Sequence, residues 1–226
     1  MTSTPPIDRE TTPVILAGGH SRRFGDEDKL RARLGGRTLV EHVSAALRSA
    51  TGRAPVVAVR DDAQREALAA SFSGAEPVRF VTDVAAYEGP IAGALAGVRA
   101  AETPWVFLCG GDMPLVTSAG ITALTTHDAP QATPQAIVPV DADGFEPLHA
   151  LYRTDSLCDA IEAIEGNAGI CTVLDGFDSV TRVPIPSHVS PMHCSLFDVD
   201  TVEDLRTLRE RRSPPTASRT TTPNAP

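Results

Sequence analysis

Short apolar runs alternate with longer helical patterns along this chain of 226 residues, and the alternation limits its fold more than any other feature. Such runs are typical of buried strands, and the stretches between them repeat apolar positions at helical spacing. The expected strands are Pro13–Ala17, Pro55–Arg60, Val78–Thr82, Trp105–Cys109, Ala136–Val140 and Val180–Pro184. The expected helices are Leu39–Ser49, Asp61–Ser71, Ile91–Ala101, Ser118–Thr126, Asp155–Glu165 and Thr201–Arg211. This order favours an α/β fold with a mostly parallel sheet and helices on both faces.

The same patterns predict one domain, at residues 13–212. Residues 1–12, which include Pro5 and Pro6, are expected to form a disordered N-terminal segment. The stretch from Ser213 to Pro226 is rich in Ser, Thr and Pro without an apolar period, so we expect a disordered tail there. A chain of this length is sufficient for one sizeable hydrophobic core.

The net charge of the chain limits the kinds of partner that it can bind. Its 29 acidic residues against 20 lysines and arginines give a formal net charge of −9, which argues against a general nucleic-acid or membrane-surface binder. No apolar run approaches the roughly 20 residues that a membrane helix needs, and the N-terminus lacks signal-peptide architecture. We therefore expect a cytoplasmic protein without nucleic-acid or membrane partners, in which any anionic ligand meets a local basic site.

A glycine-rich and basic segment follows the first expected strand. It contains Leu16-Ala17-Gly18-Gly19, Arg22, Arg23 and Asp28-Lys29, and Lys29 is the only lysine of the chain. Backbone N–H groups and cations converge in such a loop, which makes it a common phosphate site. The spacing matches neither a Walker P-loop nor a dinucleotide fingerprint. We favour a phosphate-binding role for Lys29, and the alternative is a plain turn with solvated charges.

Asp112 follows the most apolar expected strand, and Pro114 comes two residues later. A carboxylate there is well placed for Mg²⁺, which binds one or two carboxylates plus substrate phosphates. The alternative is an Asx-turn that ends the strand. Ligands of parallel sheets bind at the carboxyl ends of strands. We therefore expect the glycine-rich segment, Asp83 after the third strand, and Asp112 to form one site.

The segment near the C-terminus predicts a strand at Phe197–Asp200 that leads into a capped helix. Thr201 is the expected N-cap, and Asp204 stands at the third helical position in the manner of a capping box. Asp198 and Asp200 have two interpretations. They are a second metal ligand and an orienting group, or they are negative charge that precedes a helix N-terminus.

Together these segments resemble the MobA family, the molybdenum cofactor guanylyltransferases, within the nucleotidyltransferase superfamily. The family pattern LAGGxxxRxGxDK appears at residues 16–29, followed by Asp83 before Gly89-Pro90-Ile91-Ala92-Gly93, by Asp112-Met113-Pro114, and by a QPLxALY-like segment at Glu146–Tyr152. The motifs stand in the family's order over residues 13–211. Two segments depart from the pattern. Val57–Arg60 lacks an Asn that is frequent in the family, and Asp198–Glu203 replaces the usual NxNTPE.

The resemblance implies a Rossmann-like nucleotidyltransferase fold and transfer of GMP from GTP to the terminal phosphate of molybdopterin cofactor, with release of pyrophosphate. By the same resemblance, Leu16, Ala17, Gly18 and Gly19 line the guanine and ribose side, Lys29 contacts the phosphates, and Asp83 contacts the nucleotide. Asp112 binds Mg²⁺, with Asp200 as a second candidate ligand, and the catalytic set is Lys29, Arg23 and Asp112. Enzymes that receive the cofactor are candidates for transient contact.

Three alternatives stay open at this point. One is a cytidylyltransferase acting on the same cofactor, and another is a guanylyltransferase acting on a different phosphorylated acceptor. The third is a non-catalytic adaptor that binds the nucleotide or the cofactor.

Overall fold

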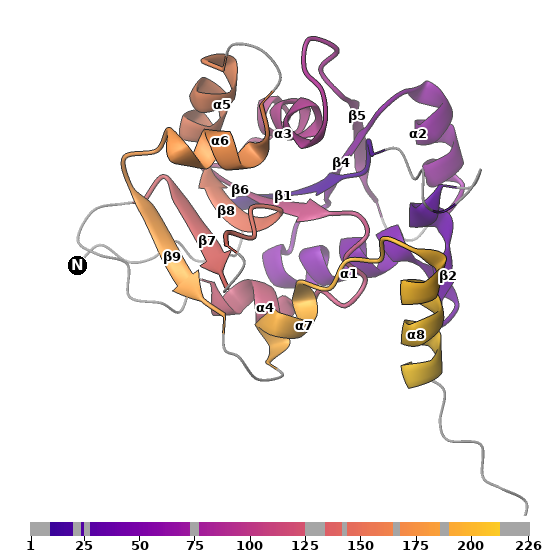
Figure 1. The fold of residues 1–226 in the computed structure, drawn as a ribbon. Helices are drawn as coiled ribbons and strands as arrows, with labels where there is room; N and C mark the ends of the chain where they lie inside the picture. Colours follow the sequence, from indigo (N-terminus) through magenta and orange to yellow (C-terminus); the bar gives the residue numbers. More distant parts are fainter. Residues whose placement is uncertain are drawn as a thin grey trace, which may run out of the picture.

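The computed structural model describes residues 10–19, 24, 28–72, 77–124, 134–141, 144–164, 168–185 and 190–212. Within these ranges a seven-stranded sheet has the order β5-β4-β1-β6-β8-β7-β9 (Figure 1). Its strands are β1 Thr11–Leu16, β4 Val56–Val59, β5 Arg79–Thr82, β6 Trp105–Gly110, β7 Ala136–Val140, β8 His149–Arg153 and β9 Val180–Pro184. A hairpin of β2 (Arg33–Leu34) and β3 (Arg37–Thr38) forms a second sheet.

The helices connect these strands. They are the 3₁₀ helix η1 Lys29–Arg31 and the α-helices α1 Leu39–Thr51, α2 Asp62–Ala69, α3 Pro90–Arg99, α4 Ser118–Ala123, α5 Thr154–Glu162, α6 Ile170–Asp175, α7 Pro191–Ser195 and α8 Val202–Arg212. None of these helices, within the ranges given above, is both long and apolar enough to cross a bilayer.

The sheet is mostly parallel, as expected. Strands β5, β4, β1 and β6 run parallel to one another, and β9 runs parallel to β7. Strand β8 is antiparallel to both β6 and β7. The predicted α/β class with a mostly parallel sheet is therefore confirmed, and the reversal at β8 divides the sheet into two parts.

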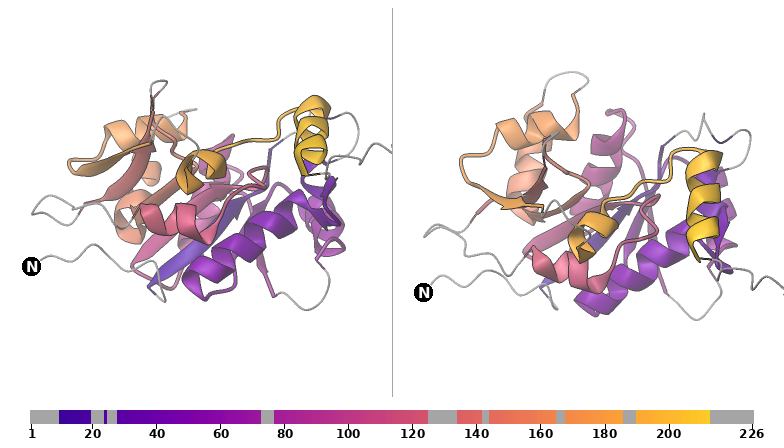
Figure 2. Two further views of the ribbon diagram at one scale, coloured as in Figure 1. Left: turned by 90° about the horizontal axis from the view of Figure 1, so that it is seen from below. Right: turned by 60° about the horizontal axis from the view of Figure 1, so that its bottom comes forward.

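Alternate residues of the strands face two apolar layers. In β1, Ile15 packs with α1 and α4, whereas Val14 packs with α3. In β6, Phe107 packs in the same layer as Ile15 and Leu108 in the same layer as Val14, because successive side chains of a strand point to opposite faces. The two layers are visible in Figure 2, where α1, α4 and α7 cover one face of the sheet and α3, α5 and α6 cover the other. The uninterrupted apolar runs of the sequence are therefore strands that are buried on both sides.

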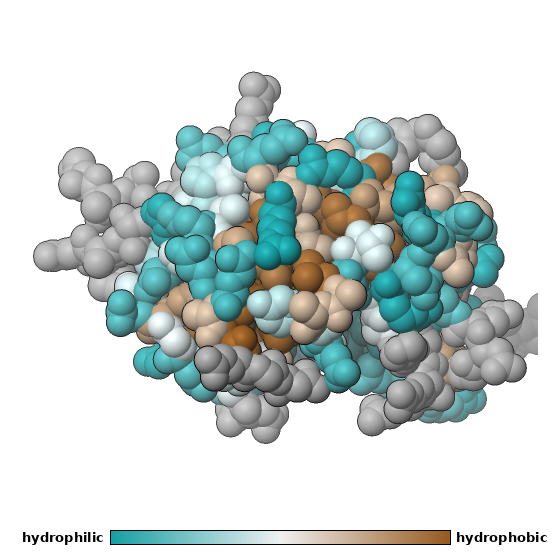
Figure 3. Space-filling model, turned by 90° about the horizontal axis from the view of Figure 1, so that it is seen from above, coloured by the Kyte–Doolittle hydropathy of each residue, from teal (hydrophilic) through white to brown (hydrophobic). Residues whose placement is uncertain are grey.

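Few hydrophobic side chains reach the surface. Val202 is the one large hydrophobic residue that is exposed among those that the structure describes. Figure 3 views the molecule from the side of α3 and α5, where hydrophobic areas are broken up by hydrophilic residues.

Strand β1 begins two residues earlier than expected. Thr11 and Thr12 lie in this strand with buried side chains, although the sequence places them in the disordered N-terminal segment. The hydroxyl of Thr12 bonds that of Thr103 at 2.6 Å, which compensates for burying both. Residues 1–9 and the predicted tail at 213–226 lie outside the described residues.

The strand expected at Phe197–Asp200 is wrong. This segment is an extended connection, and the backbone N–H of Val199 donates to the carbonyl of Asp112 at 2.9 Å. The Val199 side chain is fully buried with Leu34 of β2 and Leu39 of α1. Burial of one side chain in a small cluster therefore holds the segment, in place of a ladder of sheet hydrogen bonds.

Helix α8 fixes the end of that connection. Leu205 and Leu208 complete the cluster around Val199, and the guanidinium of Arg209 donates twice to the carbonyl of Arg33, at 2.7 and 3.1 Å. The predicted capping box is confirmed, because Thr201 Oγ1 accepts from the N–H of Asp204 while the Asp204 carboxylate accepts from the N–H of Thr201. The segment before α8 is thereby held against the carboxyl edge of the sheet.

Candidate functional site

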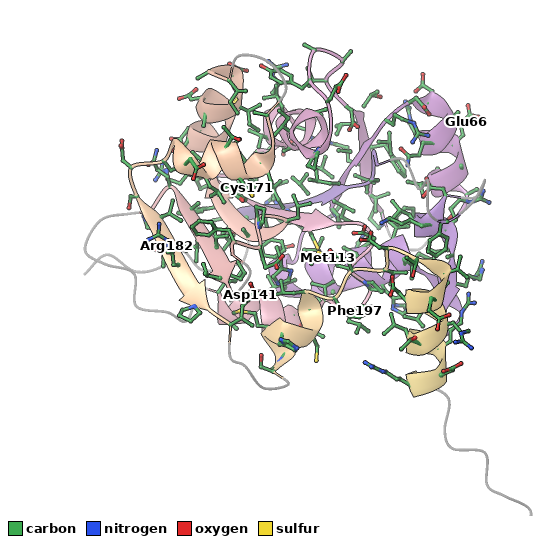
Figure 4. The ribbon with its side chains drawn as sticks, in the orientation of Figure 1. Glu66, Met113, Asp141, Cys171, Arg182 and Phe197 are labelled. Carbon is green, nitrogen blue, oxygen red and sulfur yellow. The ribbon has the colours of Figure 1, made fainter. Side chains whose placement is uncertain are left out.

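The ends of β1, β5 and β6 meet at one edge of the sheet. The N–H of Gly111 donates to the carbonyl of Leu16 at 3.0 Å, and the N–H of Asp83 donates to the carbonyl of Val59 at 2.8 Å. The segments that carry Met113 and Phe197, both labelled in Figure 4, run side by side there. The structure thus brings four separate sequence segments to the edge at which parallel sheets bind ligands.

Lys29 is the centre of the charged part of this edge. Its ammonium lies 2.5 Å from Asp112 Oδ2 and 3.0 Å from Asp200 Oδ1. The short helix η1 presents this lysine, and Asp28 caps that helix by accepting from the N–H of Leu30 at 3.0 Å. The lysine side chain is only 17% exposed. One cation therefore links the glycine-rich segment, the end of β6 and the connection before α8.

The neighbouring carboxylates favour the protonated form of Lys29. Burial lowers the pKa of Lys29, but the nearby charges of Asp112 and Asp200 outweigh burial, and the net effect raises its pKa. Asp198 lies in the same negative environment. Burial first, and then the charges of Asp112 and Asp200, raise the pKa of Asp198 to about 7. Among the described residues, Asp112, Asp198 and Asp200 gather around the Lys29 ammonium, and this grouping of carboxylates favours a further cation.

Close approach of backbone and carboxylate builds the wall of the site. A Cβ added to Gly110 would lie 2.7 Å from Asp112 Oδ1, nearer than real Cβ contacts allow. The absence of a side chain at Gly110 therefore sets the position of the Asp112 carboxylate.

Asp83 forms a second, differently built part of the site. Its Oδ1 is buried and has no hydrogen-bond partner among the described residues. Gly18 and Gly93 enclose this carboxylate so closely that a Cβ on Gly18 would overlap its Oδ2. Burial raises the pKa of Asp83, while the charge of Arg60 opposes the shift. A buried acceptor that no donor of the described residues reaches is suited to a donor on a ligand.

The other predicted site residues have varied positions. Leu16 is half-buried and contributes its carbonyl to the edge, whereas Ala17 is buried. Gly18 is partly exposed and Gly19 is exposed. Arg23, predicted as catalytic, lies outside the described residues.

Sequence reasoning missed two residues near Asp83. Arg60, at the end of β4, pairs with Asp61 at 2.9 Å and reaches the carbonyl of Gly19 at 3.5 Å. Gln64 of α2 bonds the glycine-rich segment directly, at the carbonyl of Ala17. The departure from the family pattern at Val57–Arg60 was a signal for Arg60, but no pattern singled out Gln64.

The order of these segments matches a known family. A family model described as "MobA-like NTP transferase domain" matches residues 13–183. The chain belongs to this family. The predicted resemblance is thereby confirmed, and the matched residues include both parts of the site except the connection before α8.

The names of similar proteins agree with this family assignment. A protein of Natronomonas pharaonis named "Probable molybdenum cofactor guanylyltransferase" is 37% identical over 212 residues, which are 90% of this chain and 99% of that protein. The "Molybdenum cofactor guanylyltransferase" of Cupriavidus metallidurans is 32% identical over 165 residues, which are 70% of this chain and 76% of that one.

A solved structure extends the likeness to the fold. The molybdopterin-guanine dinucleotide biosynthesis protein A of Archaeoglobus fulgidus superposes with a TM-score of 0.69 and 26% identity, covering 88% of this chain and 97% of that chain. The Rossmann-like nucleotidyltransferase architecture expected from the sequence is therefore confirmed.

Proposed function

We propose that this chain transfers GMP from GTP to the terminal phosphate of molybdopterin cofactor, forms the guanine dinucleotide cofactor and releases pyrophosphate. Family membership and the names of the relatives support this function. The single observation that carries it is the Lys29 ammonium held between Asp112 and Asp200, beside a buried Asp83 oxygen that has no partner in the described chain. The first feature is suited to phosphates and a metal, and the second to the donors of a nucleoside.

The donor set fits a magnesium ion. The described residues hold no group of three or more His, Cys, Asp or Glu side chains arranged around a metal position, but Mg²⁺ commonly uses one or two protein carboxylates together with substrate phosphates. Asp112 and Asp200 already share one cationic neighbour, and both offer hard oxygen ligands. These two residues would hold the ion, which supplies charge neutralisation to the triphosphate when bound.

The reaction requires positioning and charge more than proton transfer. An oxygen of the acceptor phosphate forms a bond to the α-phosphorus of GTP while the bond from that phosphorus to the bridging oxygen breaks, and pyrophosphate leaves with the electron pair. The acceptor is already an anionic nucleophile, so no side chain has to remove a proton. Lys29 and Arg23 stabilise the negative charge that grows on the leaving oxygens.

The opposite part of the site holds the nucleoside. Gly18 and Gly19 let a base and ribose approach the backbone, and the free Oδ1 of Asp83 accepts a hydrogen bond from the ligand. Leu16 and Ala17 line this side from the end of β1. A cytoplasmic location and transient contact with cofactor-receiving enzymes complete the proposal.

Pyrophosphate release tests the proposal. The enzyme is incubated with Mg²⁺ and either GTP or CTP, each with and without molybdopterin-loaded acceptor. We expect release only with GTP and the pterin together. Release with CTP, or with GTP and only another phosphorylated acceptor, would reassign the substrate. No release with any pair, from folded protein, would favour the adaptor alternative.

A further inference from the structure

Gln64 is a buried polar residue that joins two parts of the site. It lies on α2 with 3% of its surface exposed. Its side-chain Nε2 donates to the carbonyl of Ala17 and to Asp28 Oδ2, both at 2.7 Å. Its Oε1 accepts from the backbone N–H of Arg60 at 2.9 Å. The side chain therefore makes three short hydrogen bonds from a single amide.

The partners determine which residue can stand at this position. The Ala17 carbonyl and the Asp28 carboxylate can only accept, whereas the Arg60 N–H can only donate. A primary amide matches this set because it carries two N–H donors and an acceptor oxygen. A carboxylate lacks the donors, and an ammonium or a guanidinium lacks the acceptor. The hydrogen bonds thus use both N–H donors of the Gln64 amide and its acceptor oxygen.

The two acceptors are the ends of the glycine-rich segment. Ala17 precedes Gly18 and Gly19, and Asp28 precedes Lys29. Asp28 uses its other oxygen to cap the short helix that presents Lys29, so that one carboxylate receives both Gln64 and the N–H of Leu30. A contact at Gln64 is therefore transmitted through Asp28 to the backbone that carries the Lys29 ammonium.

We propose that Gln64 is a positioning residue of this enzyme, whose side-chain amide fixes the end of β1 relative to the helix of Lys29 and thereby places the Lys29 ammonium at the phosphates. The part of this inference that concerns catalysis rests on the proposed function. Gln64 does not touch the reacting atoms, and it acts through Ala17 and Asp28. Helix α2 is thus a component of the site, although it contributes no ligand contact.

The lone lysine allows a direct test. Protein labelled with ¹³C-lysine has one lysine side-chain signal, since Lys29 is the only lysine of the chain. We expect Gln64→Met, which keeps the length of the side chain and removes its hydrogen bonds, to shift this signal in the free protein. The same variant lowers kcat and kcat/KM together by about 10²-fold, with little change in KM for GTP, because a misplaced charge costs most in the transition state.

Gln135 provides a matched control. Its side-chain oxygen accepts from the N–H groups of Asp178 and Ser179, next to β7 and β9 and away from Lys29. Gln135→Met also removes hydrogen bonds of a glutamine, and we expect neither the lysine signal nor kcat to change. An effect of the same size in both variants would mean that Gln64 serves only the general stability of the fold, and it would overturn the inference.

A second variant separates positioning from loss of fold. Gln64→Glu places a carboxylate beside Asp28, with Asp61 and Arg60 as the other charged neighbours. Protonation of that glutamate at acidic pH restores one donor, so its kcat relative to that of Gln64→Met rises as the pH falls. Equal pH profiles of the two variants would overturn the inference, as would an unmoved lysine signal in Gln64→Met.

The lysine signal and kcat together distinguish failure of the proposed function from failure of the positioning role. If the wild-type protein forms no guanine dinucleotide, the proposed function fails, but the lysine signal still decides whether Gln64 places Lys29. If the wild-type protein is active and Gln64→Met retains its kcat, the positioning role fails and the proposed function stands.

Discussion

The two acidic parts of the site are built in opposite ways. Around Lys29, carboxylates from the end of β6 and from the connection before α8 gather about a partly buried ammonium and form ion pairs with it. Around Asp83, a carboxylate with one buried oxygen lies between two glycines, with Arg60 as a nearby cation. Ion pairs determine the arrangement of the first part. Glycines, which leave room for a carboxylate, determine the arrangement of the second.

This difference indicates how one edge of the sheet can bind two kinds of ligand group, a metal with phosphates and a hydrogen-bonding nucleoside. A cluster of charged side chains held by ion pairs tolerates exchange of partners, as binding of a metal and phosphates requires. A closely packed carboxylate with a free oxygen tolerates little change of shape, as selection of a hydrogen-bonding ligand requires. The comparison predicts that the Lys29 part responds to loss of charge and the Asp83 part to added volume.

Loss of Lys29 has the largest expected effect. Lys29→Ala removes the charge that stabilises the leaving oxygens and lowers kcat by about 10³-fold. Lys29→Arg is also impaired, because a planar fork cannot replace a point charge at a moving phosphate. Steady-state kinetics measures both, with thermal melting as the control for folding. Unchanged turnover in Lys29→Ala would remove the basis of the site.

Added volume at Gly18 comes next. The methyl group of Gly18→Ala overlaps Asp83, and such overpacking costs about 1–3 kcal/mol of folding free energy. We expect the Kd of GTP to rise about tenfold, which corresponds to ~1.4 kcal/mol. Gly19→Ala is the control for stability, because a Cβ there meets nothing within 4 Å. Equal melting temperatures for the two variants would contradict a packed wall at Asp83.

Asp83→Asn separates stability from binding. Because burial raises the folded-state pKa of Asp83 above its ordinary value of 3.8, the charged form costs folding free energy. The favourable contribution of the protonated form is present below that value and is lost as the pH rises through the folded-state pKa. Asp83→Asn should therefore melt higher than wild type at neutral pH, converge with it in acid, and bind GTP more weakly. A lower melting temperature at neutral pH would contradict this sign.

The smallest effect is expected at the cap of α8. Thr201→Ala removes the acceptor for the N–H of Asp204 and costs about 1 kcal/mol, or about 2–4 °C in melting temperature for a chain of this size. Turnover should fall less than in Lys29→Ala or Gly18→Ala, since Val199 still anchors the segment that carries Asp200. A loss of turnover as large as that of Lys29→Ala would place the cap itself in the reaction.

Much of the fold follows from local pattern. The strands at Ala136–Val140 and Val180–Pro184 have the predicted bounds, because each is a short run rich in apolar and β-branched residues. Strand β8, at His149–Arg153, was not predicted as a strand, since it leads directly into α5 without a separating turn. Its antiparallel direction depends on pairing with β6 and β7, which local pattern does not encode.

The site was predicted less completely. Lys29 and Asp112 were identifiable, one as the only lysine and the other from its place after a buried strand. The contact of Asp200 with Lys29 joins residues 171 positions apart, so neither local interpretation of Asp200 could be chosen from the sequence. Gln64 had no signal, because a glutamine on a polar helix of eight residues resembles a surface residue until its three partners are known.

The separation of Lys29 and Asp200 also has a consequence for how the protein is made. Strands β1, β4, β5 and β6 come first among the strands of the large sheet, whereas Asp200 and the anchor at Val199 are synthesised after all seven of those strands. A nascent chain that has not reached α8 therefore carries the lysine without the Asp200 carboxylate. The charged part of the site is completed only in a chain whose translation has passed α8, which delays full activity until the rest of the fold is present.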